Sequence, residues 1–117
     1  MQKTDVLALE KLDQLTIAHG SHADRSNGLC VMEIVSWVAG EPHSDHPSCT
    51  STIICTFMRN WNDSMNDKDR NKFLKPLIPH LVGTYTTKED EQTRGLLAMD
   101  WLIREFVPSW LDRKSVV

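Results

Sequence analysis

Residue types that bind metals or transfer protons are concentrated between Cys30 and Cys49, in the stretch CVMEIVSWVAGEPHSDHPSC. Histidine and cysteine are common protein ligands of zinc, so Cys30, His43, His46 and Cys49 are the candidate ligands of one ion. The order HxxHxxC is not an established zinc pattern, because structural zinc sites normally have two separated ligand pairs. The same residues also permit a structural interpretation, in which both thiols are small buried side chains and the histidines are exposed.

Glu33 and Cys49 could act chemically without a metal. Glu33 lies between Met32 and Ile34, and burial at such a position raises the pKa of a carboxyl group and suits it to acid–base catalysis. A buried hydrogen bond, an ion pair or a place at the polar edge of a helix are the alternatives. Cys49 has two histidines close to it in sequence, and a place in the first turn of a helix would favour its nucleophilic thiolate.

The first two predicted helices lie on either side of the histidine-rich turn. Apolar residues spaced three and four apart predict a helix over residues 29–39, which Gly40 would end. A second apolar stripe runs through residues 53–61. Ser44 or Asp45 would cap its helix, because short polar side chains accept hydrogen bonds from amides of the first turn. Two apolar helices would therefore present the turn between them at the surface.

Prolines divide the third predicted helix and end the last one. The third would run over residues 67–83, where Pro76 and Pro79 should kink it or split it. The last would run over residues 88–107 and end at Pro108. Its second half is apolar nearly all round, which predicts burial between other helices.

Together these segments predict an all-α fold, a compact bundle of four or five helices with one proline-interrupted element. A length of 117 residues favours a single domain, and the sequence has no internal repeat. Residues 1–28 would form an N-terminal segment and a polar loop from His19 to Gly28. Residues 29–111 would form the helical core.

Two further features concern packing. Asp100 and Arg104 are four residues apart in the last helix, and this spacing permits an ion pair that ties helices together. The four tryptophans fall at or near apolar helical stripes, which predicts core or half-buried positions. If two of them lay together at the surface, they would anchor a protein interface, because Trp is enriched at binding hot spots. The apolar last helix and its tryptophans also favour a homodimer.

Composition and charge argue against several classes of function. A net charge of -3 and an isoelectric point near 5.9, without a run of Lys and Arg, argue against nucleic-acid binding. The charged N-terminus has no signal-peptide core, and no apolar run is long enough for a membrane span. Three cysteines cannot complete a set of intramolecular disulfides, so a reduced cytoplasmic protein is expected. The sequence contains no GxSxG motif and no phosphate-binding glycine loop.

The stretches GLCVMEIVSWVAGEPHSDHPSC, RNWND, LKPLIPHLVGT and MDWLIREFVPSWL resemble a family of small uncharacterised proteins of actinobacteria and their phages. The resemblance covers the chain from about Ile17 to Leu111. It implies a phage or phage-related origin and assigns no catalytic or binding residue, because that family has no established activity. The chain departs from the family pattern at Thr52, where a proline is expected.

These observations favour a non-enzymatic binding or interaction module with a protein partner and no cofactor. The resemblance implies a phage accessory protein that acts on a host component. The expected surface combines the turn from Glu41 to Cys49 with the loop from His19 to Arg25, and its candidate contact residues are His22, Glu33, Glu41, His43, Asp45 and His46. One alternative is a zinc-binding or small hydrolytic protein that uses the same turn. Another is a protein that sequesters a small ligand or nucleotide in a polar pocket with Arg and Trp side chains.

Overall fold

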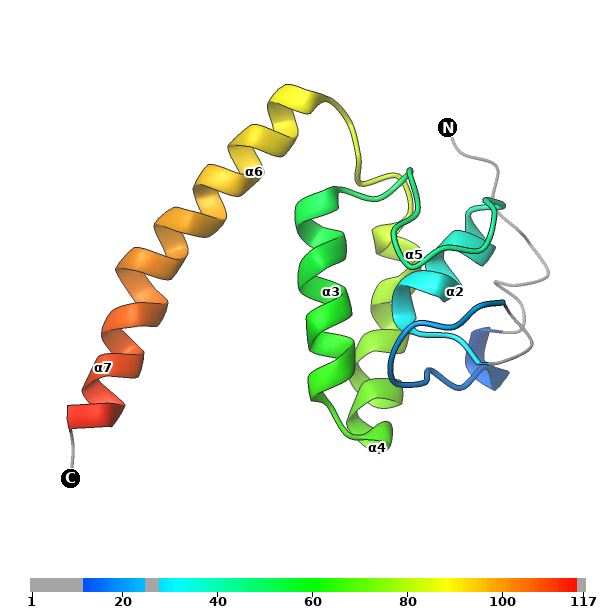
Figure 1. Ribbon diagram of the computed structural model, residues 1–117, viewed down its shortest axis with the longest axis horizontal. Coiled ribbons are helices and arrows are strands. Elements are labelled where there is room, and N and C mark those ends of the chain that lie inside the picture. The colour runs from blue at the N-terminus through cyan, green and yellow to red at the C-terminus, as the bar shows by residue number, and fades with distance from the viewer. Residues whose placement is uncertain (1–11, 25–27, 116–117) are drawn as a thin grey trace. The chain divides into compact units, whose positions relative to one another are not determined.

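The computed structural model describes residues 12–24 and 28–115, and the chain divides into two compact units, residues 1–86 and 87–117 (Figure 1). All regular elements of the described residues are helical, which confirms the all-α class with its proline-interrupted element. The single domain stays a prediction. Arg25 of the expected binding loop lies outside the described residues, as does most of the N-terminal segment.

Helix α2 (Val31–Val38) forms the centre of the first unit. Seven of its eight residues are buried, and Trp37 is partly exposed. It lies against α3 (Thr52–Ser64) and α5 (Ile78–Leu81), as Figure 1 shows. A helix that is apolar nearly all round has to be covered on all sides, so the segments before and after α2 fold back over it.

The end of α2 depends on one glycine, as the sequence predicts. Gly40 has a φ of 74°, in the left-handed region that glycine enters without strain. Its amide donates to the carbonyl of Trp37 (3.0 Å), and the amide of Glu41 donates to the carbonyl of Ser36 (2.9 Å). These two bonds satisfy carbonyls at the helix end and direct the chain into the histidine-rich turn.

Helix α3 begins later than the sequence pattern predicted. Its N-cap is Ser51, whose hydroxyl accepts a hydrogen bond from a first-turn amide at 3.3 Å. The expected cap at Ser44 or Asp45 is therefore wrong. Thr52 stands at the first helical position, where proline is also favoured, so the departure from the family pattern at this residue is compatible with a helix start. The physical reason for the late start is the turn held by Glu41, described below.

The third helical segment changes its winding around its prolines, as predicted. From the cap residue Asn66 it passes through α4 (Asp67–Asp69), a π-helical turn η3 (Arg70–Leu74) and a 3₁₀ turn η4 (Lys75–Leu77) into α5. Proline has no amide hydrogen and clashes with the carbonyl four residues before it. The wider turn η3 ends two residues before Pro76 and contains the carbonyl with which that ring would clash in an ordinary helix.

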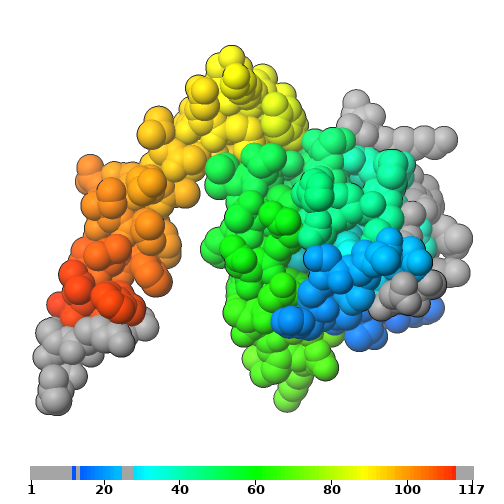
Figure 2. Space-filling model, viewed as in Figure 1, coloured from blue at the N-terminus to red at the C-terminus, as the bar shows by residue number. Residues whose placement is uncertain are grey.

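Two buried polar side chains join α3 to the segments around it. Asn62 is fully buried; it accepts a hydrogen bond from the amide of Val31 (3.1 Å) and donates to the carbonyl of Ala18 (3.0 Å). Arg70 is 2% exposed and donates from Nε to the carbonyl of Asn62 (2.7 Å). Figure 2 shows the blue segment that contains Ala18 beside the green atoms of α3. No spacing pattern in the sequence singles out either residue.

The second unit is one continuous helix. It consists of α6 (Lys88–Trp101), a π-helical turn η5 (Leu102–Phe106) and α7 (Val107–Ser115), which follow one another without a break (Figure 1). The side chain of Thr87 caps its start. The prediction that Pro108 ends this helix is wrong: a π-helical turn again precedes the proline, and the chain continues as a helix beyond it.

Candidate functional site

The carboxylate of Glu33 is buried and hydrogen-bonded on both oxygens. It is 1% exposed, at the third position of α2. Oε1 accepts from the amide of Cys30 (2.8 Å) and lies 2.8 Å from Nδ1 of His22. Oε2 accepts from the amide of His22 (2.7 Å) and lies 3.3 Å from Nε2 of His43. Each carboxylate oxygen thus has two partners, which is the number of hydrogen bonds that it can readily accept. The group therefore makes its contacts within the chain.

The ionisation of Glu33 is the reverse of what acid catalysis needs. Burial by itself raises the pKa of Glu33, but the hydrogen bonds from Cys30 and His22 outweigh burial and lower the pKa. Glu33 therefore stays ionised at neutral pH. The lowered pKa does not support a general acid, and the alternative of a buried hydrogen-bonded carboxylate describes the residue. Glu33 holds the loop that contains His22 against the start of α2.

His43 connects the histidine-rich turn to the same cluster. Its Nε2 donates to the backbone carbonyl of His22 at 2.8 Å, because a carbonyl oxygen only accepts. The two side chains are 16% exposed for His22 and 17% for His43. The structure thus brings together the loop and the turn that the sequence analysis combined into one surface, but it does so through contacts that are mostly buried.

Glu41 closes the turn between α2 and α3. Its Oε1 accepts from the amide and the hydroxyl of Ser48 (2.8 and 2.7 Å), and its Oε2 accepts from the amide of Cys49 (3.0 Å). Burial raises the pKa of Glu41, but these hydrogen bonds outweigh it and lower the pKa. The turn over residues 41–49 is therefore held in a non-helical conformation, and α3 cannot begin until Ser51.

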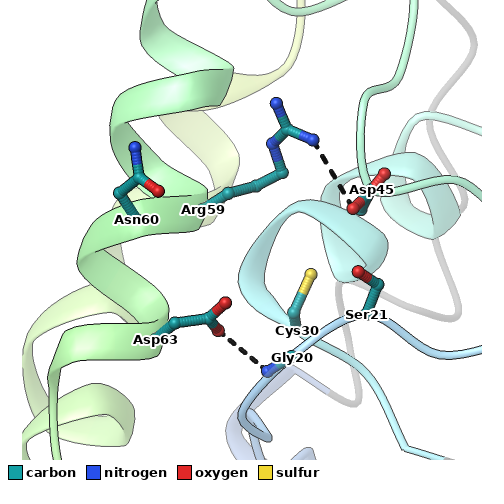
Figure 3. A pocket seen from close by; sticks show the side chains of 7 residues that line it. All are labelled: Gly20, Ser21, Cys30, Asp45, Arg59, Asn60 and Asp63. Atoms are coloured by element: carbon teal, nitrogen blue, oxygen red, sulfur yellow. Dashed lines mark hydrogen bonds and ion pairs between the residues drawn. The ribbon is translucent and has the colours of Figure 1, made fainter.

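Asp45 and Arg59 face each other across a pocket beside α3 (Figure 3). The carboxylate lies 3.6 Å from the guanidinium of Arg59 and 2.6 Å from Nδ1 of His46. Burial raises the pKa of Asp45, but hydrogen bonds with His46 and Ser21 and the charge of Arg59 outweigh it and lower the pKa. Asp45 anchors the turn, whereas the side chain of His46 is 73% exposed.

The pocket between these residues is small and has polar walls. Its volume is about 270 Å³, below the roughly 300–1,000 Å³ that is typical of ligand sites. Its walls are Gly20, Ser21, Cys30, Asp45, Arg59, Asn60 and Asp63, so the expected Trp is not among them. The pocket could not be predicted from the sequence, because the apolar stripe of α3 does not tell which polar residue of that helix faces the turn.

The three thiols are buried and have raised pKa values. Burial raises the pKa of Cys30 to about 12, and it also raises the pKa of Cys49 and of Cys55. Cys49 precedes the N-cap Ser51 and so lies outside the first turn of α3. This position and the raised pKa do not support a nucleophilic Cys49, because its surroundings favour the neutral thiol.

We expect all three cysteines to react slowly with iodoacetamide in the folded protein at mildly alkaline pH. The reason is that each thiol is both buried and held in its protonated form. The number of alkyl groups added over time, followed by mass spectrometry with and without urea, measures this. Rapid addition of a single label at Cys49 in the folded protein would contradict the assignment.

The four candidate zinc ligands have different surroundings. Cys30 lines the pocket, His43 bonds to the loop, His46 is exposed, and Cys49 donates its amide to Glu41. Over residues 12–24 and 28–115, no three side chains of His, Cys, Asp or Glu are placed to hold one metal ion. The arrangement of the turn therefore does not support the zinc hypothesis.

Acid should weaken the fold of the first unit. The pKa values of Glu33, Glu41, Asp45 and Asp63 are all lowered in the folded chain, because hydrogen bonds outweigh burial. A lowered folded pKa gives stability that is complete above the unfolded pKa, roughly 4, and is lost as the pH falls through the folded pKa. We expect the Tm to fall steadily below about pH 5. A Tm that stays constant or rises on acidification, measured by circular dichroism, would contradict this.

The second unit exposes a long apolar surface. Ten large apolar side chains are 39–73% exposed, and we call them the apolar helix surface: Leu96, Leu97, Met99, Trp101, Leu102, Ile103, Phe106, Val107, Trp110 and Leu111. Within residues 87–115 no second helix covers these side chains, and burial of this helix between other helices stays a prediction. The rings of Trp101 and Phe106 lie 5.7 Å apart, and Trp110 is also exposed. Trp101 and Trp110 are thus both at the surface of this helix, nine residues apart in the sequence.

The predicted ion pair in this helix forms, but not between helices. Nε of Arg104 donates to Oδ1 of Asp100 at 2.7 Å, and both side chains are mostly exposed. Such a pair on one helix stabilises it by only about 0.2–0.5 kcal/mol. The pair therefore does not tie two helices together, as the sequence analysis expected.

Comparisons with known proteins add no family to this description. No family model, curated protein or solved structure matches the chain. Among the described residues, every helix is too short or too polar to cross a membrane. The function is therefore argued from the geometry of the described residues.

Proposed function

We propose that this chain is a non-enzymatic protein-interaction module that binds through the apolar helix surface. The observation that carries the proposal is the set of ten exposed apolar side chains on one helix. Aromatic side chains have roughly 150–250 Å² each to bury, and three aromatic and seven aliphatic side chains, each about half exposed, lie on this one helix. A typical monomer exposes apolar patches of about 300–600 Å² at most, and each partner of a standard interface contributes about 800 Å².

The residues that suggested chemistry support the non-enzymatic alternative. The oxygens of Glu33 and Glu41 accept hydrogen bonds from within the chain, and the pKa values of the thiols are raised. A hydrolytic centre needs an activated nucleophile next to a base. This geometry therefore favours a structural role for the predicted binding residues, in which they hold the loop and the turn together.

The resemblance to proteins of actinobacteria and their phages leads to a more specific proposal. A phage-encoded chain of this kind would be an accessory protein that acts on a host component. Three free buried cysteines support a place in the reducing cytoplasm.

Photo-crosslinking from within the apolar helix surface tests the proposal. A photoreactive phenylalanine analogue at Ile103, which is 62% exposed, is compared in expressing cells with the same analogue at Lys68, which is exposed on the first unit. The expected result is a crosslinked protein from position 103, either a second copy or another chain, and little from position 68. Equal crosslinking from both positions, or none from 103, would contradict the proposal.

A sequestering role is the second candidate, because Nε of Arg59 is buried without a hydrogen-bond partner. Arg59 lines the pocket of about 270 Å³ and a neighbouring one of about 260 Å³, so an anionic ligand would find a donor there. A ligand that binds the folded state raises its Tm. A rise in Tm with inorganic phosphate or a nucleotide, absent from Arg59→Met, would support this candidate, and no shift would count against it.

A further inference from the structure

We propose that the pocket beside α3 binds a small zwitterion, a free α-amino acid, with its carboxylate on Arg59 and its ammonium group on Asp63. All residues that line this pocket belong to the first unit, so the inference goes beyond the interaction module, which uses the last helix. It rests on the sequestering candidate and deepens it, because it names a ligand that carries both charges instead of an anion alone.

The guanidinium of Arg59 has unused hydrogen-bond donors. Among the arginine side chains that the structure describes, Arg70, Arg94 and Arg104 donate at 2.7, 3.1 and 2.7 Å, whereas Arg59 donates no hydrogen bond. Its Nη1 lies 3.6 Å from the carboxylate of Asp45, and its Nε is buried without a partner. A guanidinium has five N–H donors and binds a carboxylate with two of them at once. Arg59 can therefore bind a ligand carboxylate without giving up a hydrogen bond.

Asp63 provides an available carboxylate oxygen on the other side of the pocket. Its Oδ1 accepts from the amide of Gly20 (2.8 Å) and from the side-chain amide of Asn62 (2.9 Å), and neither bond uses Oδ2. Burial raises the pKa of Asp63, but the hydrogen bonds with Asn62 and Gly20 outweigh it and lower the pKa. This exposed group is therefore ionised at neutral pH and suited to an ammonium ligand.

Arg59 and Asp63 are one helical turn apart but do not pair with each other. Opposite charges at this spacing lie on one helix face and can form an ion pair. Arg59 instead points to the turn at Asp45, and Asp63 points to the loop at Gly20 (Figure 3), so no ion pair joins these two described residues. Both side chains line the pocket, which therefore has a positive side and a negative side.

The charges of the walls favour a ligand that carries both signs. The lining contains the guanidinium of Arg59 and the carboxylates of Asp45 and Asp63. A lone anion would lie close to two carboxylates and a lone cation close to the guanidinium, and like charges repel. A zwitterion places each of its charges against the opposite one. Asp45 already contacts His46 at 2.6 Å, so Asp63 is the carboxylate available for the ammonium group.

The size and the polarity of the pocket fit an amino acid with a short side chain. A volume of about 270 Å³ holds on the order of nine waters at roughly 30 Å³ each. The other walls are small or polar: Gly20, Ser21, Cys30 and Asn60. They favour a short polar ligand such as L-serine over one with a large apolar side chain.

Titration of the full chain with L-serine and with glycine at neutral pH tests the proposal. The amide NMR signals of Gly20, Ser21 and Asn60 report on the pocket, and the expected result is a saturable shift of these signals. Acetate has the carboxylate without the ammonium group, and methylammonium has the ammonium group without the carboxylate. Each should bind about tenfold more weakly or worse, because it lacks one charge-assisted set of hydrogen bonds.

Two variants test the two ends of the ligand separately. Asp63→Asn keeps an oxygen for the amide of Gly20 but removes the charge, and Arg59→Met removes the guanidinium. Each should weaken the binding of L-serine by about tenfold or more. The matched controls are Asp100→Asn and Arg104→Met, an exposed pair with the same four-residue spacing, and both should leave the affinity unchanged. Unchanged amide signals of α2 show that a variant is still folded.

The outcomes separate this inference from the proposed function. The absence of a saturable shift with both L-serine and glycine overturns the proposal. Acetate or inorganic phosphate that binds as tightly as L-serine, with no loss of affinity in Asp63→Asn, also overturns it and leaves the sequestering candidate with an anion. Crosslinking from Ile103 tests the interaction module independently, because it does not involve the pocket.

Discussion

Replacing Glu33 by Gln is expected to lower the free energy of unfolding by about 2–4 kcal/mol. The carboxylate accepts from the amides of Cys30 and His22 and contacts the His22 and His43 rings. Gln has nearly the same volume as Glu but only one acceptor oxygen. The NH₂ group of Gln would face N–H groups from which the carboxylate now accepts hydrogen bonds. Urea unfolding followed by circular dichroism measures the loss. The matched control is Glu105→Gln, since Glu105 is exposed and should change stability little.

The loss caused by Glu33→Gln should also depend on pH in one direction. The pKa of Glu33 is lowered in the folded chain, so its contribution is complete above the unfolded pKa, roughly 4, and disappears as the pH falls through the folded value. The difference between wild type and variant should therefore shrink in acid. A difference that is as large in acid as at neutral pH, or one no larger than that of Glu105→Gln, would contradict the role given to Glu33.

Replacing Arg70 by Met is expected to cost a similar amount, about 2–4 kcal/mol. The guanidinium is 2% exposed and donates to the carbonyls of Asn62, at 2.7 Å, and of Met65. Met fills the space of the aliphatic stem but leaves both carbonyls at the end of α3 without their donors. The bond to Asp67 contributes little, because that carboxylate is 89% exposed.

Lys68→Met is the control for Arg70→Met, because Lys68 is exposed in the same segment. Arg70→Lys should give an intermediate loss, since one ammonium group cannot reach both carbonyls in the fork geometry of Arg. Urea unfolding of the three variants measures the order. If Arg70→Met were as stable as Lys68→Met, the buried guanidinium would not be joining α3 to η3.

Local signals in the sequence predicted the elements whose causes are local. Gly40 ended α2, and Pro76 and Pro79 marked the segment where helical winding changes. The start of α3 was mispredicted, because the carboxylate that holds the turn, Glu41, binds amides seven and eight residues away. Pro108 was mispredicted for a different reason: a π-helical turn relieves the clash that ends an ordinary helix.

The candidate site was predictable in its residues but not in its chemistry. The sequence placed Glu33 in an apolar helix, and a buried hydrogen bond was one of the alternatives that it left open. The direction of its pKa shift depends on the amide of Cys30 and on donors from the loop at His22, eleven residues earlier. No spacing rule gives the position of that loop. For the last helix, the sequence indicated an apolar surface but not what covers it. Its apolar residues indicated that something must cover it, but composition does not tell whether the cover comes from the same chain or from another one.

Amide hydrogen exchange across residues 96–111, measured on the full chain at increasing protein concentration, tests the central claim most directly. A lone helix with exposed side chains opens readily, whereas a helix covered by a partner is protected. The account predicts that exchange in this segment slows as concentration rises, while exchange in α2 does not change. Exchange at 96–111 that is independent of concentration would contradict the homodimer expected from the apolar last helix.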